Sequence, residues 1–207
     1  MRPSLRKALS PLLLAFPLLL AACATVRPGA PEAGSRTALL LAVNDIYRIE
    51  GVENGTVGGL ARLRALREEL EGEAPDLLMF HAGDLLSPSF LSRSYRGAQM
   101  IDVLNVLDGD PAAFDRRLFI VFGNHEFDRD DLADAPDLDQ RVEESQFTWV
   151  NGNVVFGKEA DGKPLVDAAN LAPTALVESG GIRIGIFGLT TDIKHPAYVD
   201  RFRDPAA

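Results

Sequence analysis

Three short apolar runs, each followed closely by a polar residue that can bind a metal, set the strongest limit on the fold of this chain. The runs cover residues 39–43, 77–80 and 118–122, and the polar residues that follow them are Asp45, Asp84 and Asn124. These residues stand about 40 positions apart, which is the length of a strand, a helix and two loops before the next parallel strand. Ligands of open α/β sheets bind beyond the carboxyl ends of the strands. The spacing therefore predicts an α/β fold in which three oxygen donors meet at one edge of a parallel sheet.

The segments around these runs carry the periodicities of helices and of a hairpin. Leu60, Leu63, Leu66 and Leu70 recur at helical spacing, which predicts a helix with a buried leucine face. A second amphipathic helix is expected over 97–107, and a further strand over 147–150. Apolar runs at 174–177 and 182–187 flank Gly180-Gly181, a pattern typical of a β-hairpin. The acidic run 129–144 is expected to form a solvated surface.

The loop Gly123-Asn124-His125-Glu126-Phe127-Asp128 is the strongest functional motif. The amide oxygen of Asn124 can bind a metal, His125 can bind one or transfer a proton, and an acidic neighbour can orient the His ring. The alternative is a turn built from residues that favour turns. His81, at the end of the second run, is expected to be a partly buried histidine with satisfied hydrogen bonds, or else to support Asp84.

The N-terminal part of the chain has the features of an export signal. A positively charged start is followed by an apolar stretch from Ala8 to Leu20, too short for an ordinary membrane span. Leu20-Ala21-Ala22-Cys23 matches a bacterial lipoprotein signal, with Cys23 as the lipidated residue; an ordinary signal peptide with a chance cysteine is the alternative. We therefore predict a signal peptide over 1–22, a flexible Pro- and Gly-containing tether over 23–36 and a domain over 37–207. The protein would be exported and anchored by lipid to a bacterial membrane, facing the periplasm or the exterior.

The formal net charge of −9 argues against nucleic-acid binding, which relies on basic patches. It does not exclude a phosphorylated substrate, because bound metal ions can dominate the local field.

Four motifs together resemble the calcineurin-like metallophosphoesterases, in particular the bacterial periplasmic 5′-nucleotidase type. They are Asn44-Asp45, Gly58-Gly59-Leu60-Ala61-Arg62, Ala82-Gly83-Asp84 and Gly123-Asn124-His125-Glu126-Phe127-Asp128. The resemblance implies an α/β/β/α sandwich, here incomplete, with parallel βα units followed by a β-hairpin. It also implies hydrolysis of phosphate monoesters, probably of 5′-nucleotides, at a centre of two divalent metal ions whose identity stays open.

The same resemblance assigns roles to individual residues. Asp45 would bind the first metal ion, Asp84 would bridge both and Asn124 would bind the second. His125 would stabilise or protonate the leaving oxygen, with Asp128 holding its ring. A bridging water activated by both ions would be the nucleophile.

Two departures from the family pattern stand out. The family usually has His two residues after the first Asp, where this chain has Tyr47, which is expected to bind metal as a phenolate or to act in a supporting role. The family's later histidine boxes have no counterpart among His81, His125 and His195, so the chain resembles the first part of a catalytic domain. Two alternatives stay open: a non-catalytic lipid-anchored binding or scaffold protein, and a phosphodiesterase of the same superfamily.

Overall fold

The computed structural model describes residues 35–206, and a five-stranded parallel sheet organises them. The strand order is β1-β2-β3-β4-β6, and every neighbouring pair is parallel. The bounds are β1 Leu40–Val43, β2 Leu78–His81, β3 Asp115–Ile120, β4 Phe147–Val150 and β6 Leu171–Ala172. The predicted α/β class is confirmed, and the first three predicted strands lie side by side in the predicted order.

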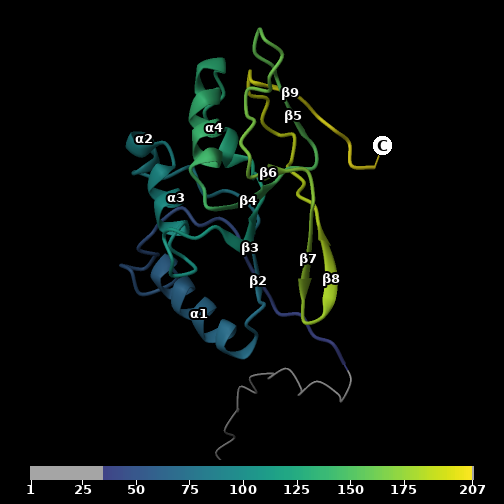
Figure 1. The fold of residues 1–207 in the computed structure, drawn as a ribbon. Coiled ribbons are helices and arrows are strands. Elements are labelled where there is room, and N and C mark those ends of the chain that lie inside the picture. The colour runs from purple at the N-terminus through teal and green to yellow at the C-terminus, as the bar shows by residue number, and fades with distance from the viewer. Residues whose placement is uncertain (1–34, 207) are drawn as a thin grey trace, which may run out of the picture.

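The helices lie on one face of this sheet (Figure 1). They are α1 Leu60–Glu73, α2 Ser92–Tyr95, α3 Ala98–Leu104 and α4 Ala135–Glu143, with short 3-10 turns η1 His125–Phe127 and η2 Leu132–Asp134. The helices expected around Leu60 and Gly97 are confirmed. The acidic run 129–144 is not simply a solvated surface, because α4 buries Ala135, Leu138 and Val142 in the core. The many acidic residues of this run led to the prediction of a solvated surface, although its apolar residues recur at helical spacing.

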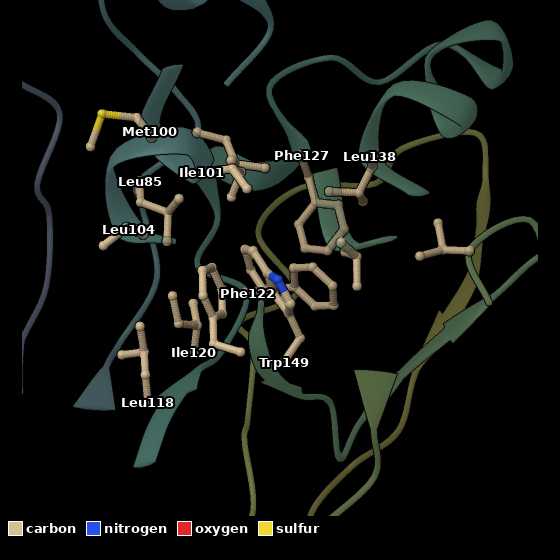
Figure 2. Packing of buried hydrophobic residues seen from close by; sticks show 14 of the residues in the cluster. Leu85, Met100, Ile101, Leu104, Leu118, Ile120, Phe122, Phe127, Leu138 and Trp149 are labelled. Atoms are coloured by element: carbon tan, nitrogen blue, oxygen red, sulfur yellow. The ribbon is translucent and has the colours of Figure 1, made fainter. Parts of the chain in front are cut away.

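The core between the helices and the sheet centres on aromatic side chains (Figure 2). The ring of Phe122 stacks on Trp149 with centroids 4.9 Å apart, and Phe127 lies 5.7 Å from Phe122. The indole N–H of Trp149 donates to the hydroxyl of Ser145, so this buried donor is satisfied. Phe122 directly precedes the predicted functional loop and Phe127 lies within it, so packing fixes the loop at both places.

The opposite face of the sheet is covered by the hairpin of β7 Ala175–Ser179 and β8 Ile182–Ile186 (Figure 1). Its turn residues Gly180 and Gly181 have φ of 58° and 70°, which a two-residue hairpin turn requires. Val177 and Ile184 pack with Leu78 and Phe119 in a second, smaller apolar cluster. The predicted hairpin is confirmed. A further antiparallel pair joins β5 Val154–Phe156 to β9 Val199–Phe202.

Residues 1–34 and 207 lie outside the described part of the chain. The predicted signal peptide, Cys23 and most of the tether fall there and stay predictions. Within residues 35–206, no helix combines the length and the hydropathy that crossing a membrane requires.

Candidate metal centre

Asp45 and Asp84 follow neighbouring strands at the same edge of the sheet. Val43 and His81 are paired in the β1–β2 ladder, and the backbone N–H of Asp45 donates to the carbonyl of Gly83 at 3.2 Å. Both aspartates have positive φ, 54° and 62°, a region that side chains other than Gly rarely adopt. Such positions cluster at functional sites, and two of the five non-glycine residues with positive φ in the described part of the chain are predicted metal ligands.

The loop that follows β3 lies directly against Asp84. The backbone N–H of His125 donates to Asp84 Oδ1 at 2.7 Å. A Cβ on Gly123 would collide with the carboxylate of Asp84, so only glycine allows this close approach. Asn124 lies between these two contact points. The structure therefore brings Asp45, Asp84 and Asn124 together at one edge of the sheet.

Glu126 holds the second and third strand ends together, a role that the sequence did not predict. Its buried carboxylate accepts hydrogen bonds from the backbone N–H groups of Asp84, Leu85 and Leu86, which follow β2. It accepts a fourth from the N–H of Gly123 in its own loop. Burial raises the pKa of Glu126, and the four N–H groups oppose that shift. The only signal in the sequence was an acidic residue directly before the apolar Phe127.

His125 and Asp128 form a hydrogen-bonded pair beside Asp84. The Nδ1 atom of His125 lies 2.8 Å from Asp128 Oδ2, which also accepts the hydroxyl of Ser87 at 2.9 Å. Asp128 Oδ1 pairs with the ammonium of Lys194 at 3.0 Å. Burial alone would raise the pKa of Asp128, but the bonds to His125, Lys194 and Ser87 outweigh it and lower the pKa. The carboxylate is therefore ionised at neutral pH.

Tyr47 contacts both the first strand end and the His125 ring. Its hydroxyl donates to Asp45 Oδ1 at 2.6 Å, and its ring meets that of His125 edge-on with centroids 5.9 Å apart. Burial and the bond to Asp45 raise the pKa of Tyr47, so the phenol is a neutral donor. The bonds from Tyr47 and Asn44 lower the pKa of Asp45 and favour its ionised form. Of the two roles expected for Tyr47, this geometry favours the supporting one.

The side chains of the other two histidines make no hydrogen bond to these donors within the described part of the chain. His81 is buried, and its Nδ1 accepts the N–H of Gly83 at 3.2 Å, while Nε2 has no partner among the described residues. Burial lowers the pKa of His81 to about 4, so its ring is neutral. His81 is therefore buried more completely than expected, and only one of its ring nitrogens has a hydrogen-bond partner. His195 is exposed in the loop between β8 and β9.

The chemical type of these donors suits a hard divalent cation. Two carboxylates and an amide are oxygen ligands of the type that Mg²⁺, Ca²⁺ and Mn²⁺ prefer. In the described part of the chain, no three His, Cys, Asp or Glu side chains are grouped so that they could hold an ion. The donor set thus depends on Asn124 and supplies fewer protein ligands than two closed metal sites require.

The fold and the loop motifs can now be compared with known proteins. A sequence profile described as calcineurin-like phosphoesterase matches residues 38–205. The chain belongs to the calcineurin-like phosphoesterase family. Members of this family typically bind a pair of metal ions.

Relatives of this family member include 5′-nucleotidases. The 5′-nucleotidase of Mus musculus is 28% identical over 204 residues, covering 92% of this chain and 31% of the mouse protein. A probable 5′-nucleotidase of Treponema pallidum (strain Nichols) is 32% identical over 135 residues, covering 65% of this chain and 20% of that protein. This chain therefore spans less than a third of the length of either relative.

Solved structures agree on the fold. The crystal structure of a 5′-nucleotidase precursor from Thermus thermophilus superimposes with a TM-score of 0.63 at 31% identity, covering 81% of this chain and 32% of that chain. The structure of Haemophilus influenzae NAD nucleotidase gives a TM-score of 0.60 at 20% identity, covering 80% of this chain and 29% of that chain. At that identity the second likeness concerns the fold alone.

Proposed function

We propose that this protein takes part in the metal-dependent hydrolysis of phosphate monoesters, with 5′-nucleotides as the substrate class. The observation that carries the proposal is the hydrogen bond from the His125 backbone to the Asp84 carboxylate. It joins two of the three donor-bearing strand ends and places the His125–Asp128 pair beside them. The resemblance of the chain to 5′-nucleotidases supports the choice of substrate.

In this proposal the chain's own residues bind cations and handle one proton. Asp45, Asp84 and Asn124 would hold the ions, with Asp84 between them. Bound divalent ions would neutralise phosphate charge and lower the pKa of a coordinated water. Asp128 accepts a hydrogen bond from Nδ1–H of His125, and Nε2, when it also carries a proton, would donate that proton to the leaving oxygen. Tyr47 would keep the Asp45 carboxylate oriented.

The proposal is tested by hydrolysis of 5′-AMP with and without Mn²⁺ by the full chain and by its Asp84→Asn variant. We expect phosphate release that depends on Mn²⁺, is abolished by EDTA and falls at least about a hundredfold in Asp84→Asn. The matched control is an Asp161→Asn variant, which changes an exposed aspartate outside the candidate metal centre in the same way. Equal Mn²⁺-dependent rates in Asp84→Asn and the unchanged protein would refute the proposal. A parallel assay with bis(p-nitrophenyl) phosphate tests the phosphodiesterase alternative.

A second candidate is a binding or scaffold protein that keeps the fold without catalysis. Tyr47 favours it, because a neutral phenol stands where the family pattern has a histidine ligand. Calorimetric titration with Mn²⁺ separates the two functions, since a scaffold should show no tight divalent site.

We also propose that the protein is exported and anchored to a membrane through lipid on Cys23. The residues before Cys23 support this, because small residues precede the cysteine after a short apolar run. Expression of a Cys23→Ser variant tests it. The variant should leave the membrane fraction, and unchanged membrane association would contradict the proposal.

A further inference from the structure

The connection between β8 and β9 brings a lysine to the His125–Asp128 pair. We propose that Lys194 is a positioning residue for His125, acting through Asp128 as a fixed ionic partner. This inference rests on the proposed function for its kinetic consequence, but its structural consequence can be measured independently of any activity.

The backbone on both sides of Lys194 is anchored to residues that flank the functional loop. Before it, the hydroxyl of Thr190 donates to the carbonyl of Phe122 at 2.8 Å. Thr190 is itself held by Asn153, which accepts its N–H at 2.8 Å and donates to its carbonyl at 2.7 Å. Both residues are buried. This start of the connection is therefore fixed against the end of β3.

After Lys194, a second set of bonds ties the connection to the end of the functional loop. The N–H of Ala197 donates to the carbonyl of Asp130 at 2.7 Å, and the hydroxyl of the buried Tyr198 donates to the carbonyl of Arg129 at 2.9 Å. Lys194 thus lies between two anchors that both end on the segment carrying His125 and Asp128. Its position follows from the fold and not from a chance encounter of mobile side chains.

The two oxygens of Asp128 have separate partners. Oδ1 faces the Lys194 ammonium at 3.0 Å, while Oδ2 faces His125 Nδ1 at 2.8 Å and the Ser87 hydroxyl at 2.9 Å. A partial rotation of the carboxylate would move both oxygens away from these partners and weaken the contacts to Lys194 and His125 together. With Oδ2 held as an acceptor, Nδ1 of His125 keeps its proton, and Nε2 is the ring nitrogen that takes up and donates a second proton.

The same chain offers a comparison pair. Lys163 and Asp161 lie 3.8 Å apart with side chains 74% and 56% exposed, so solvent screens their attraction. Lys194 and Asp128 are closer, at 39% and 21% exposure, and Asp128 carries two further hydrogen bonds. Lys163 is therefore a matched control for removing a lysine charge without touching the functional loop.

Nitrogen-15 NMR of histidine-labelled full-length protein at neutral pH tests the proposal, with a His125→Gln variant identifying the His125 signals. In the unchanged protein we expect the pattern of a ring protonated on Nδ1. Lys194→Met and Lys194→Gln should move both ring nitrogens toward the averaged shifts of mixed tautomers. Lys194→Arg should restore the original pattern, and Lys163→Met should leave it unchanged. An unaltered His125 tautomer in both neutral variants would overturn the proposal.

Steady-state hydrolysis of 5′-AMP supplies the kinetic readout. We expect Lys194→Met to lower kcat about tenfold with KM within about twofold, and Lys194→Arg to recover most of the loss. A loss of kcat that arginine does not rescue would contradict the positioning role. Absence of hydrolysis by the unchanged chain would refute the proposed function, and the NMR result would still decide the role of Lys194. Lys194→Gln, nearly isosteric and polar, keeps the test valid if the methionine variant does not fold.

Discussion

The two halves of the candidate metal centre are held in different ways. The Asp84 half, residues 83–86 with 123–128, is held by the buried carboxylate of Glu126 and its four backbone N–H donors. The Asp45 half, residues 44–47, relies on side-chain bonds from Tyr47 and Asn44 at an exposed carboxylate. One backbone bond, from Asp45 to Gly83, and the edge-on contact between the Tyr47 and His125 rings join the halves.

The Asp84 half is formed by packing and hydrogen bonds of the fold itself, whereas the Asp45 half would be completed by a bound cation. The Asp84 half belongs to the core, since Phe122 before its loop and Phe127 within its loop are both buried (Figure 2). The Asp45 half follows β1, an edge strand of the sheet, and its carboxylate is ionised and accessible. We therefore expect the Asp84 half to keep its geometry without metal, and the Asp45 half to be ordered further by cation binding.

Removing Glu126 should cause the largest loss of stability among the variants considered. Glu126→Ala leaves four backbone N–H groups without their acceptor, and we expect it to lower the free energy of unfolding by about 3–5 kcal/mol. Urea denaturation followed by circular dichroism measures this. Glu143→Ala, at an exposed position of the same region, is the control and should change stability by less than about 0.5 kcal/mol. Similar stabilities of the two variants would show that Glu126 does not hold the Asp84 half.

Acid should weaken the Asp84 half through His81. Because burial lowers the pKa of His81 to about 4, the unfolded chain binds this proton at a higher pH than the folded protein does. The contribution of His81 to stability should therefore be present above about pH 6.5 and fall by up to about 3 kcal/mol as the pH approaches 4.

Urea denaturation at pH 7 and at pH 5 measures this loss as the difference between the unchanged protein and a His81→Gln variant. Carboxylates titrate in both proteins and cancel in that difference. The same pH dependence in both would contradict a buried neutral His81.

Loss of the Tyr47 hydroxyl should have the smallest effect on stability. Tyr47→Phe removes one partly exposed hydrogen bond, so the free energy of unfolding should fall by no more than about 1 kcal/mol. Mn²⁺ affinity should nevertheless fall about tenfold, because Asp45 loses the donor that orients it. Calorimetry and denaturation on the same sample compare the two effects. If Tyr47→Phe lost as much stability as Glu126→Ala, the two halves would not differ in how the fold holds them.

The sequence was sufficient for the parallel strands, the hairpin and the motifs, because these depend on local periodicity and on strand-end spacing. It could not reveal Glu126 as the central hydrogen-bond acceptor, since the role depends on backbone groups some 40 residues away. Lys194 was missed for the same reason, as its partner Asp128 lies in another loop. In α4 the abundance of Asp and Glu concealed Leu138 and Val142, whose burial depends on tertiary packing.

The most direct test of the account is calorimetric titration of Mn²⁺ into the full chain and into Asp84→Asn, with Asp161→Asn as control. We expect saturable binding to the unchanged protein and the control, and an affinity at least about tenfold lower in Asp84→Asn. Equal binding by all three proteins would contradict a cation site at the meeting point of Asp45, Asp84 and Asn124.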